Sequence, residues 1–212
     1  MPSRSTLEGF IKTLGQNPFL VLESALLLPG RSKDSLAELE NKKGLGLPRT
    51  LAEAYAEVGG AHISWRLSPD GYEKLYPGAA GNKHRYDVSG NLDLLSPEEA
   101  FDGFTGDGWR DVYRWHSEDY YPVDFASDYL NMGFGTPLQP DVDRLLLNVL
   151  YDDLLAPLEM TLAEYLQRGA ELMFLNDWQL TLLNDEEYAA QEEKVRDLRR
   201  RLASLAADAP GR

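Results

Sequence analysis

Three aspartates in one short stretch are the residues of this sequence whose type and spacing most resemble a metal or catalytic site. Asp119, Asp124 and Asp128 fall within ten residues, and carboxylate oxygens are the ligands that hard divalent cations prefer. Their spacing matches no calcium-loop motif, and no glycine lies between them to make a sharp turn. With His116 nearby, a metal-assisted hydrolase is one hypothesis, but the spacing favours it less than a binding role.

Other enzyme motifs are missing from the sequence. The three histidines, His62, His84 and His116, lie far apart and form no HxH or HExxH pattern. There is no GxSxG nucleophile motif, and the GAAGN segment at 78–82 lacks the lysine of a phosphate-binding loop. The chain has no cysteine, which excludes disulfides and thiolate metal sites. We therefore expect no enzymatic activity, no catalytic residue, no metal and no cofactor.

The acidic charge is concentrated in the middle of the chain. The net charge is −14, and residues 87–164, with 17 acidic residues and three arginines, carry all of it. Such a field repels nucleic acids and anionic membranes and attracts basic partners. We expect no nucleic-acid or membrane binding. A basic protein partner and simple solubility both explain the charge, and the sequence leaves the two open.

Aromatic residues crowd the same segment and predict a binding surface. Seven of them lie between Trp109 and Tyr129. In a strand over residues 119–125, one of the two adjacent tyrosines faces the core and the other faces solvent. An outward tyrosine beside carboxylates suits Arg and Lys side chains through ion pairs and cation–π contacts. The predicted partner-binding residues are Glu118, Asp119, Tyr120, Tyr121, Asp124 and Asp128.

The hydrophobic pattern predicts helices, then strands, then helices. Ser32 as N-cap and Gly44 as a stop define a helix between them, and a second helix over 47–60 is expected to end at the pair Gly59–Gly60. Residues 17–30 fit either a strand or a buried helix. Strands are expected over 61–67, 119–125, 128–135 and 144–153, and residues 86–95 fit either a strand or a hairpin that turns at Ser89–Asn91. Further helices are expected over 5–15, 96–104 and 161–175.

The end of the chain predicts a long helix. Heptad spacing over 185–208 is kept by Tyr188, Val195, Leu198, Leu202 and Leu205. It suits packing on the domain or a homodimeric coiled coil, so a monomer and a homodimer through this helix both stay open. The fold class is α+β: a single domain with a mixed, mainly antiparallel sheet of about six strands flanked by helices. Its parts are a helical extension (1–30), a core (31–183) and a C-terminal helix with a short disordered tail (184–212).

Residues 36–65, LAELENKKGLGLPRTLAEAYAEVGGAHISW, resemble the entry module of the SUKH superfamily, of the Smi–Knr type named for a regulator of cell-wall assembly. Members have a helix, a G-x-x-LP step, a second helix with an N-G or G-G end, and a strand. Here the step is Gly44–Pro48 and the pair is Gly59–Gly60. The resemblance covers roughly residues 30–180. It implies a six-stranded type of α+β fold without established catalytic residues.

The resemblance also implies two functions. Bacterial members resemble immunity proteins that bind and neutralise toxins, and eukaryotic relatives resemble regulatory scaffolds. Because nuclease toxins must be basic to hold phosphates, the acidic middle favours the immunity type, with an intracellular scaffold as the alternative. The apolar run Phe19–Leu28 contains Glu23 and is too short to span a bilayer. It also lacks the flanks of a signal peptide, so we expect a cytoplasmic protein.

Overall fold

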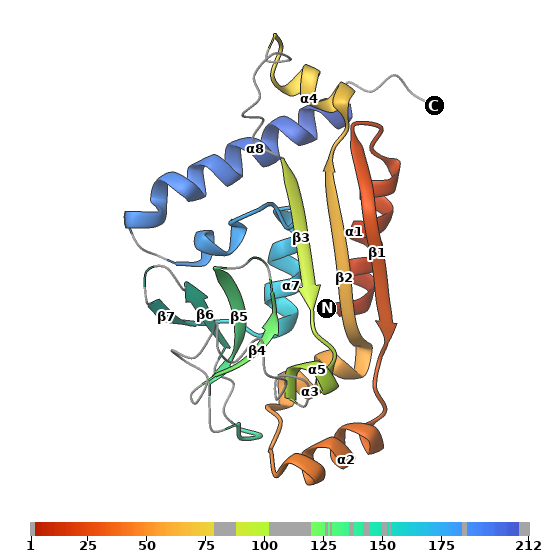
Figure 1. Cartoon of the computed structure of the whole chain (residues 1–212), viewed down its shortest axis with the longest axis vertical. Coiled ribbons are helices and arrows are strands. Elements are labelled where there is room, and N and C mark those ends of the chain that lie inside the picture. Colours follow the sequence, from red (N-terminus) through yellow and green to blue (C-terminus); the bar gives the residue numbers. More distant parts are fainter. Residues whose placement is uncertain are drawn as a thin grey trace.

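The structure of the chain is a computed structural model, and its central feature is an antiparallel sheet (Figure 1). The residues that it describes are 3–78, 88–101, 120–125, 127, 129–135, 138–141, 145–149, 152, 154–183 and 186–207. They form a seven-stranded sheet whose strands lie in chain order. The strands are β1 (Leu20–Pro29), β2 (Val58–Leu67), β3 (Ser89–Leu94), β4 (Tyr120–Asp124), β5 (Leu130–Gly135), β6 (Leu145–Val149) and β7 (Leu154–Leu158). All pairings between these strands are antiparallel. The α+β class and the mainly antiparallel sheet are confirmed, and the sheet of the described residues has seven strands where about six were predicted.

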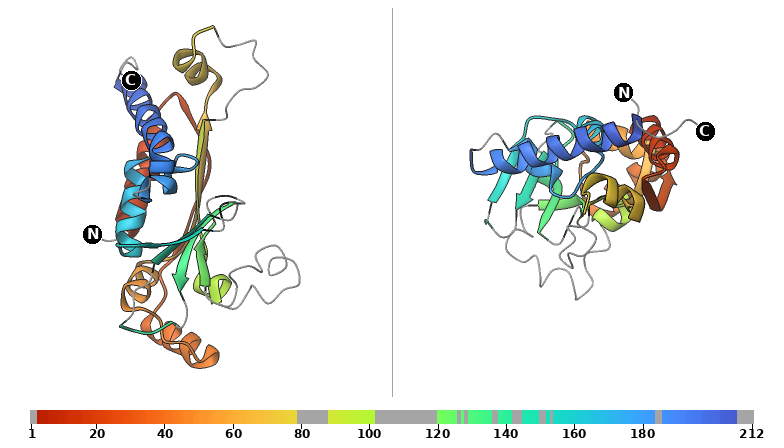
Figure 2. Two further views of the ribbon diagram at one scale, coloured as in Figure 1. Left: turned by 90° about the vertical axis from the view of Figure 1, so that its left-hand side faces the viewer. Right: turned by 90° about the horizontal axis from the view of Figure 1, so that it is seen from above.

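Helices cover one face of this sheet. Among the described residues the α-helices are α1 (Ser3–Gln16), α2 (Lys33–Lys43), α3 (Arg49–Glu57), α4 (Pro69–Leu75), α5 (Pro97–Phe101), α7 (Leu162–Glu171) and α8 (Ala189–Ala207). The short 3₁₀ helices η3 (Trp178–Leu182) and η4 (Glu186–Tyr188) lie between α7 and α8. Figure 2 shows α1, α7 and α8 on the same side of the sheet. None of the described helices has the length and apolar character needed to cross a membrane.

The predicted signals at the ends of α2 act as expected. The Ser32 hydroxyl accepts a hydrogen bond from a backbone N–H in the first turn. Gly44 has a φ of 65°, the left-handed conformation that glycine adopts without steric cost. The pair Gly59–Gly60 does not end α3 as predicted. That helix stops at Glu57, and both glycines lie inside β2.

The described residues at the start of the chain, 3–30, belong to the same sheet and core as the rest. β1 pairs with β2 along most of its length. On α1, Leu7 and Leu14 are buried, and the Phe10 ring meets Phe174 edge-on with centroids 5.2 Å apart. The predicted helical extension over 1–30 therefore contains a strand as well as a helix. The apolar run Phe19–Leu28 is compatible with a strand or a buried helix. Pairing with β2, which is distant in the sequence, makes it a strand.

The long C-terminal helix packs on its own domain. Tyr188, Val195 and Leu202 are buried, and Leu198 and Leu205 pack against the same core. The described elements that α8 contacts include η3, η4 and α4. The heptad face thus contacts this chain's own core, which is one of the two predicted arrangements.

The sheet consists of two ladders that meet at one point. Strands β1–β3 form the first ladder and β4–β7 the second, visible as two groups in Figure 1. Between β3 and β4 the register contains a single pair, Leu94 with Asp124. On either side of this pair, the Leu95 N–H donates to the Val123 carbonyl at 2.8 Å and the Phe125 N–H donates to the Asp93 carbonyl at 3.1 Å. The predicted site residues of β4 therefore lie beside the junction of the two ladders.

Candidate functional site

Only two of the predicted partner-binding residues have side chains in the described part of the chain. Tyr121 is half-buried, and its ring packs against Phe101 with centroids 5.3 Å apart. Asp124 is fully buried, with 0% exposure. The prediction that Asp124 faces a partner is therefore wrong. Outside the described residues lie Glu118, Asp119, Asp128 and the side chain of Tyr120.

An irregularity in β4 explains why Asp124 points inward. Side chains of a regular strand alternate between its faces, so Val123 and Asp124 are expected on opposite sides. The register with β5 shifts between Pro122 and Asp124, and both Val123 and Asp124 are buried. A bulge adds an unpaired residue and redirects the side chains next to it. The expected alternation of side chains along β4 therefore fails at Asp124, one of the predicted partner-binding residues.

The Asp124 carboxylate is the centre of a buried polar network. One oxygen accepts the backbone N–H of Asp93 at 3.0 Å, and the other accepts the hydroxyl of Tyr165 at 2.5 Å. The Gln179 side-chain amide donates to the Tyr165 hydroxyl at 3.3 Å. Burial raises the pKa of Asp124 to about 6, and the two hydrogen bonds only partly offset that effect. The network ties β3, β4, α7 and η3 together at the junction of the ladders.

The segment after α7 covers the part of β3 that β4 leaves unpaired. Met173, Phe174 and Asp177 have positive φ values of 61°, 45° and 66°, which are costly for residues with side chains. The Trp65 indole donates to the Met173 carbonyl at 2.8 Å, and the Asn91 N–H donates to the Phe174 carbonyl at 2.9 Å. Strain that the surrounding structure enforces in this way is common at functional sites.

A polar groove of about 410 Å³ opens beside this left-handed segment. Its lining consists of Asn91, Ser127, Tyr129, Phe174, Leu175, Asn176, Asp177 and Gln179. The Asp177 carboxylate accepts the Tyr129 hydroxyl and, at 3.2 Å, the Gln191 side-chain amide. Burial raises the pKa of Asp177, and the nearby charge of Lys194 lowers it by less. The side-chain amides and hydroxyls of this groove, with the carboxyl group of Asp177, can form hydrogen bonds with a polar ligand.

The described residues contain no candidate metal centre. No group of three His, Asp or Glu side chains among them is arranged to hold an ion. His62 is exposed, and its Nδ1 lies 3.2 Å from a carboxylate oxygen of Asp93. His84 and His116 lie outside the described residues. Asp124, one of the predicted ligands, has both oxygens engaged in the buried network.

Several described acidic residues of the middle segment stabilise the fold itself. Glu98 pairs with Arg31 at 2.6 Å, and Glu99 accepts the backbone N–H at the start of α5. Asp141 and Glu159 differ from these residues because both are exposed and make no hydrogen bond or ion pair in the described chain. These two carboxylates are therefore available to a partner.

Comparisons with known proteins do not assign a family. The chain matches no protein-family model and no curated protein. The case for its function rests on its residues and their arrangement.

Sequence patterns did not predict the polar partners of Asp124. Periodicity places Tyr165 on the inward face of α7, but it says nothing about a contact with a residue 41 positions away. Gln179 lies in a 3₁₀ helix whose sequence has no distinctive pattern. The pair Asn176–Asp177 is the one usable signal, because both residue types tolerate left-handed backbone and favour turns.

Proposed function

We propose that this protein is a cytoplasmic, non-catalytic binding domain that neutralises a basic protein, such as a nuclease toxin, in the manner of SUKH immunity proteins. The resemblance of residues 36–65 to that superfamily supports the proposal. The order of elements is compatible with it, because α2, the Gly44–Pro48 step, α3 and β2 follow one another along the chain. Fold alone does not define function, so the proposal depends on a specific surface.

The proposal rests on the end of the sheet where β4 and β6 begin. The register pairs Tyr120 with Gly135, and it pairs Leu145 with both Phe134 and Leu158. The start of β4, the end of β5, the start of β6 and the end of β7 consequently lie together.

Acidic residues adjoin this end of the sheet. Glu159 directly follows β7, and Asp141 precedes β6 by four residues. In the sequence, Glu118 and Asp119 directly precede Tyr120. These two residues lie outside the part of the chain that the structure describes. We call the two exposed residues Asp141 and Glu159 the acidic end.

A basic protein suits the acidic end. Exposed carboxylates without partners in the chain repel one another and contribute nothing to its fold, whereas they accelerate association with a positively charged surface. A nuclease needs such a positive surface to hold phosphates. The acidic end differs from the surface expected from sequence, because it gains Asp141 and Glu159 and loses the buried Asp124.

The test is co-expression with the products of the genes that neighbour this one. A toxic neighbour should be neutralised and should co-purify with the chain. The double variant Asp141→Lys with Glu159→Lys should weaken this binding at least about tenfold, mainly by slowing association. The control is Asp34→Lys with Glu38→Lys on α2, which changes the net charge equally at exposed positions that are not part of the acidic end.

Two results would contradict the proposal in different ways. Equal weakening by both double variants means that net charge alone governs binding, and the acidic end is then not the site. If no neighbouring gene encodes a toxin that the chain neutralises, the immunity role is wrong. A regulatory scaffold of the Smi–Knr type would then be the better hypothesis.

A further inference from the structure

The polar groove beside the left-handed segment contains a buried acceptor that the chain itself does not use. Gln179 lines this groove and is 1% exposed. Its side-chain Oε1 makes no hydrogen bond within the described residues. An unpaired buried acceptor destabilises a folded chain, and such atoms are uncommon in native structures. A ligand that donates a hydrogen bond to this oxygen would satisfy it.

The hydrogen bonds around Gln179 determine which end of its amide is unpaired. The Tyr165 hydroxyl donates its one hydrogen to Asp124, so toward Gln179 it can act only as an acceptor. The amide nitrogen of Gln179 therefore faces Tyr165, at 3.3 Å, and the oxygen is the end without a partner. A ligand that binds Gln179 Oε1 must consequently supply an N–H or O–H donor.

A half-buried carboxylate lines the same groove. The two oxygens of Asp177 accept the Tyr129 hydroxyl and, at 3.2 Å, the Gln191 amide. A carboxylate has about four acceptor sites, so Asp177 can accept further hydrogen bonds. Burial raises the pKa of Asp177 by more than the charge of Lys194 lowers it, and Lys194 is not among the described residues that line the groove. The negative charge of Asp177 is thus incompletely compensated.

The lining of the groove favours a positively charged donor. Among the described residues that line it there is no arginine, lysine or histidine, and Asp177 is the one charged residue. Asn176 adds a side-chain oxygen, because its amide nitrogen donates to the Ser89 hydroxyl at 3.0 Å. The groove therefore combines several hydrogen-bond acceptors with a single negative charge.

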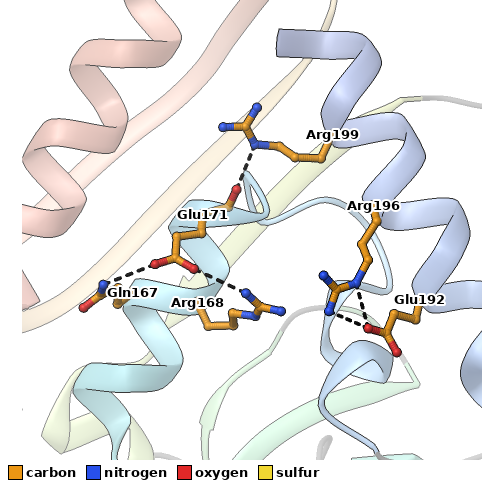
Figure 3. Close-up of polar contacts among 6 residues, drawn as sticks. All are labelled: Gln167, Arg168, Glu171, Glu192, Arg196 and Arg199. Atoms are coloured by element: carbon orange, nitrogen blue, oxygen red, sulfur yellow. Dashed lines mark hydrogen bonds and ion pairs between the residues drawn. The ribbon is translucent and has the colours of Figure 1, made fainter.

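The segment that carries these acceptors is held in place by α8. At the end of α7, the Glu171 carbonyl accepts a hydrogen bond from Arg199 Nε at 2.8 Å (Figure 3). Farther along the chain, Gln191 of the same helix donates to Asp177. Residues of α8 thus hold the chain both before the left-handed segment and at its end. Acceptors that are positioned in advance lose less conformational freedom when a ligand binds.

We propose that this groove binds a guanidinium group, with Gln179 and Asp177 as its acceptors. A guanidinium carries several N–H donors in a planar fork and has no acceptor, so one group can donate to an amide oxygen and to a carboxylate. Gln179 Oε1 is shielded from water, so its partner has to leave its own hydration shell. A guanidinium is more weakly hydrated than an ammonium and loses less in doing so.

The size of the groove agrees with a ligand of this kind. Its volume of about 410 Å³ falls within the range of about 300–1,000 Å³ that is typical of small-molecule sites. Two sources supply guanidinium groups, namely the arginine side chain of a protein and a free small guanidine. The chemistry of recognition is the same for both, and the choice of probes separates them.

Isothermal titration calorimetry of the full chain with N-acetyl-L-arginine amide, the arginine probe, tests the proposal. We expect saturable binding. N-acetyl-L-lysine amide carries the same charge on an ammonium group and should bind at least about tenfold more weakly. Asp177→Asn retains a residue type that tolerates left-handed backbone and should weaken binding of the arginine probe at least about tenfold. The control is Asp34→Asn on α2, which changes the net charge equally at an exposed position and should leave the affinity unchanged.

A second variant removes the unpaired oxygen itself. Gln179→Leu should also weaken binding of the arginine probe at least about tenfold. Because Gln179 is buried, thermal melting checks that this variant folds, and Asp177→Asn decides the question if it does not. The proposal is overturned by the absence of saturable binding, by equal affinity for the two probes, by equal weakening in Asp34→Asn, or by wild-type affinity in a folded Asp177→Asn or Gln179→Leu protein.

Ethylguanidine distinguishes the two sources, because it lacks the peptide groups of the arginine probe. Tighter binding of the arginine probe indicates an arginine residue of a protein, whereas equal or tighter binding of ethylguanidine indicates a free small guanidine. Both results agree with recognition of a guanidinium group. This proposal does not rest on the acidic end. Its variants leave Asp141 and Glu159 unchanged, so the two proposals can fail separately.

Discussion

The hydroxyl of Tyr165 donates a 2.5 Å hydrogen bond to a carboxylate oxygen of Asp124, where the two ladders of the sheet meet. Both side chains are fully buried. The second oxygen of Asp124 accepts the backbone N–H of Asp93 on β3. One carboxylate therefore connects α7, β3 and β4 at the single register pair between the ladders. We expect substitutions here to change stability and not partner binding.

Tyr165→Phe should destabilise the protein by about 1–3 kcal/mol, because a buried oxygen of Asp124 loses its donor. Denaturation by urea measures this change. The control is Tyr121→Phe, since the Tyr121 hydroxyl makes no hydrogen bond in the described chain. That substitution should change the free energy of unfolding by less than about 0.5 kcal/mol. Equal losses in the two variants would contradict a special role for the Tyr165 hydroxyl.

The stability contributed by Asp124 should depend on pH. Burial raises its pKa from 3.8 to about 6 in the folded chain, so the folded state binds this proton more tightly than the unfolded state. The contribution is complete below pH 3.8 and is lost as the pH rises to about 6. Asp124→Asn removes this titration. The difference in unfolding free energy between pH 4 and pH 7 should then change by on the order of 3 kcal/mol.

The wild type provides the reference for that measurement. Other groups with shifted pKa values, such as Asp177 and Glu164, titrate in both proteins, and their effects cancel in the comparison. Unfolding curves at several pH values give the two profiles. Parallel profiles between pH 4 and pH 7 would show that Asp124 does not titrate in this window.

Gly90→Ala should destabilise the protein by about 1–3 kcal/mol through overpacking. A Cβ atom at this position would lie 2.6 Å from the carbonyl oxygens of both Met173 and Phe174, and these are held by the left-handed segment. The control is Gly9→Ala inside α1, where nothing lies within 4 Å. That change should stabilise the helix by about 0.5–1 kcal/mol. Opposite shifts in melting temperature are expected, and a neutral Gly90→Ala would contradict the close packing.

Leu202→Ala tests whether α8 is part of the folded core. Leu202 is 1% exposed, and removing its side chain should cost about 2–5 kcal/mol. The control is Leu26→Ala on β1, because Leu26 is 54% exposed and should change stability by less than about 0.5 kcal/mol. Thermal melting compares the two. A small effect of Leu202→Ala would mean that α8 detaches in solution.

Local features of the fold were predictable because their signals lie within a few residues. Ser32 and Gly44 mark the ends of α2 through a side-chain cap and a left-handed glycine. Ile63, Trp65 and Leu67 alternate along β2, and all three are buried on one face. Each of these signals acts through a neighbouring backbone group or through the period of the strand. No distant part of the chain is needed to interpret them.

The candidate sites could not be predicted because they depend on contacts between distant residues. Asp124 and Tyr165 are 41 positions apart and lie on different elements, so only the tertiary structure shows their hydrogen bond. Glu159 follows the end of β7, and only the register with β6 places that end of β7 beside the start of β6. The burial of Asp124 follows from a register shift, which alternation within the strand cannot reveal.

The sequence by itself determined the α+β class, the caps, the alternating strands and the location of the negative charge in the middle of the chain. The tertiary structure decided that residues 20–29 form a strand, that Asp124 lies inside, and that the two ladders meet at one pair. Propensity and period are properties of short segments. Pairing, register and burial instead depend on which distant surface each segment packs against.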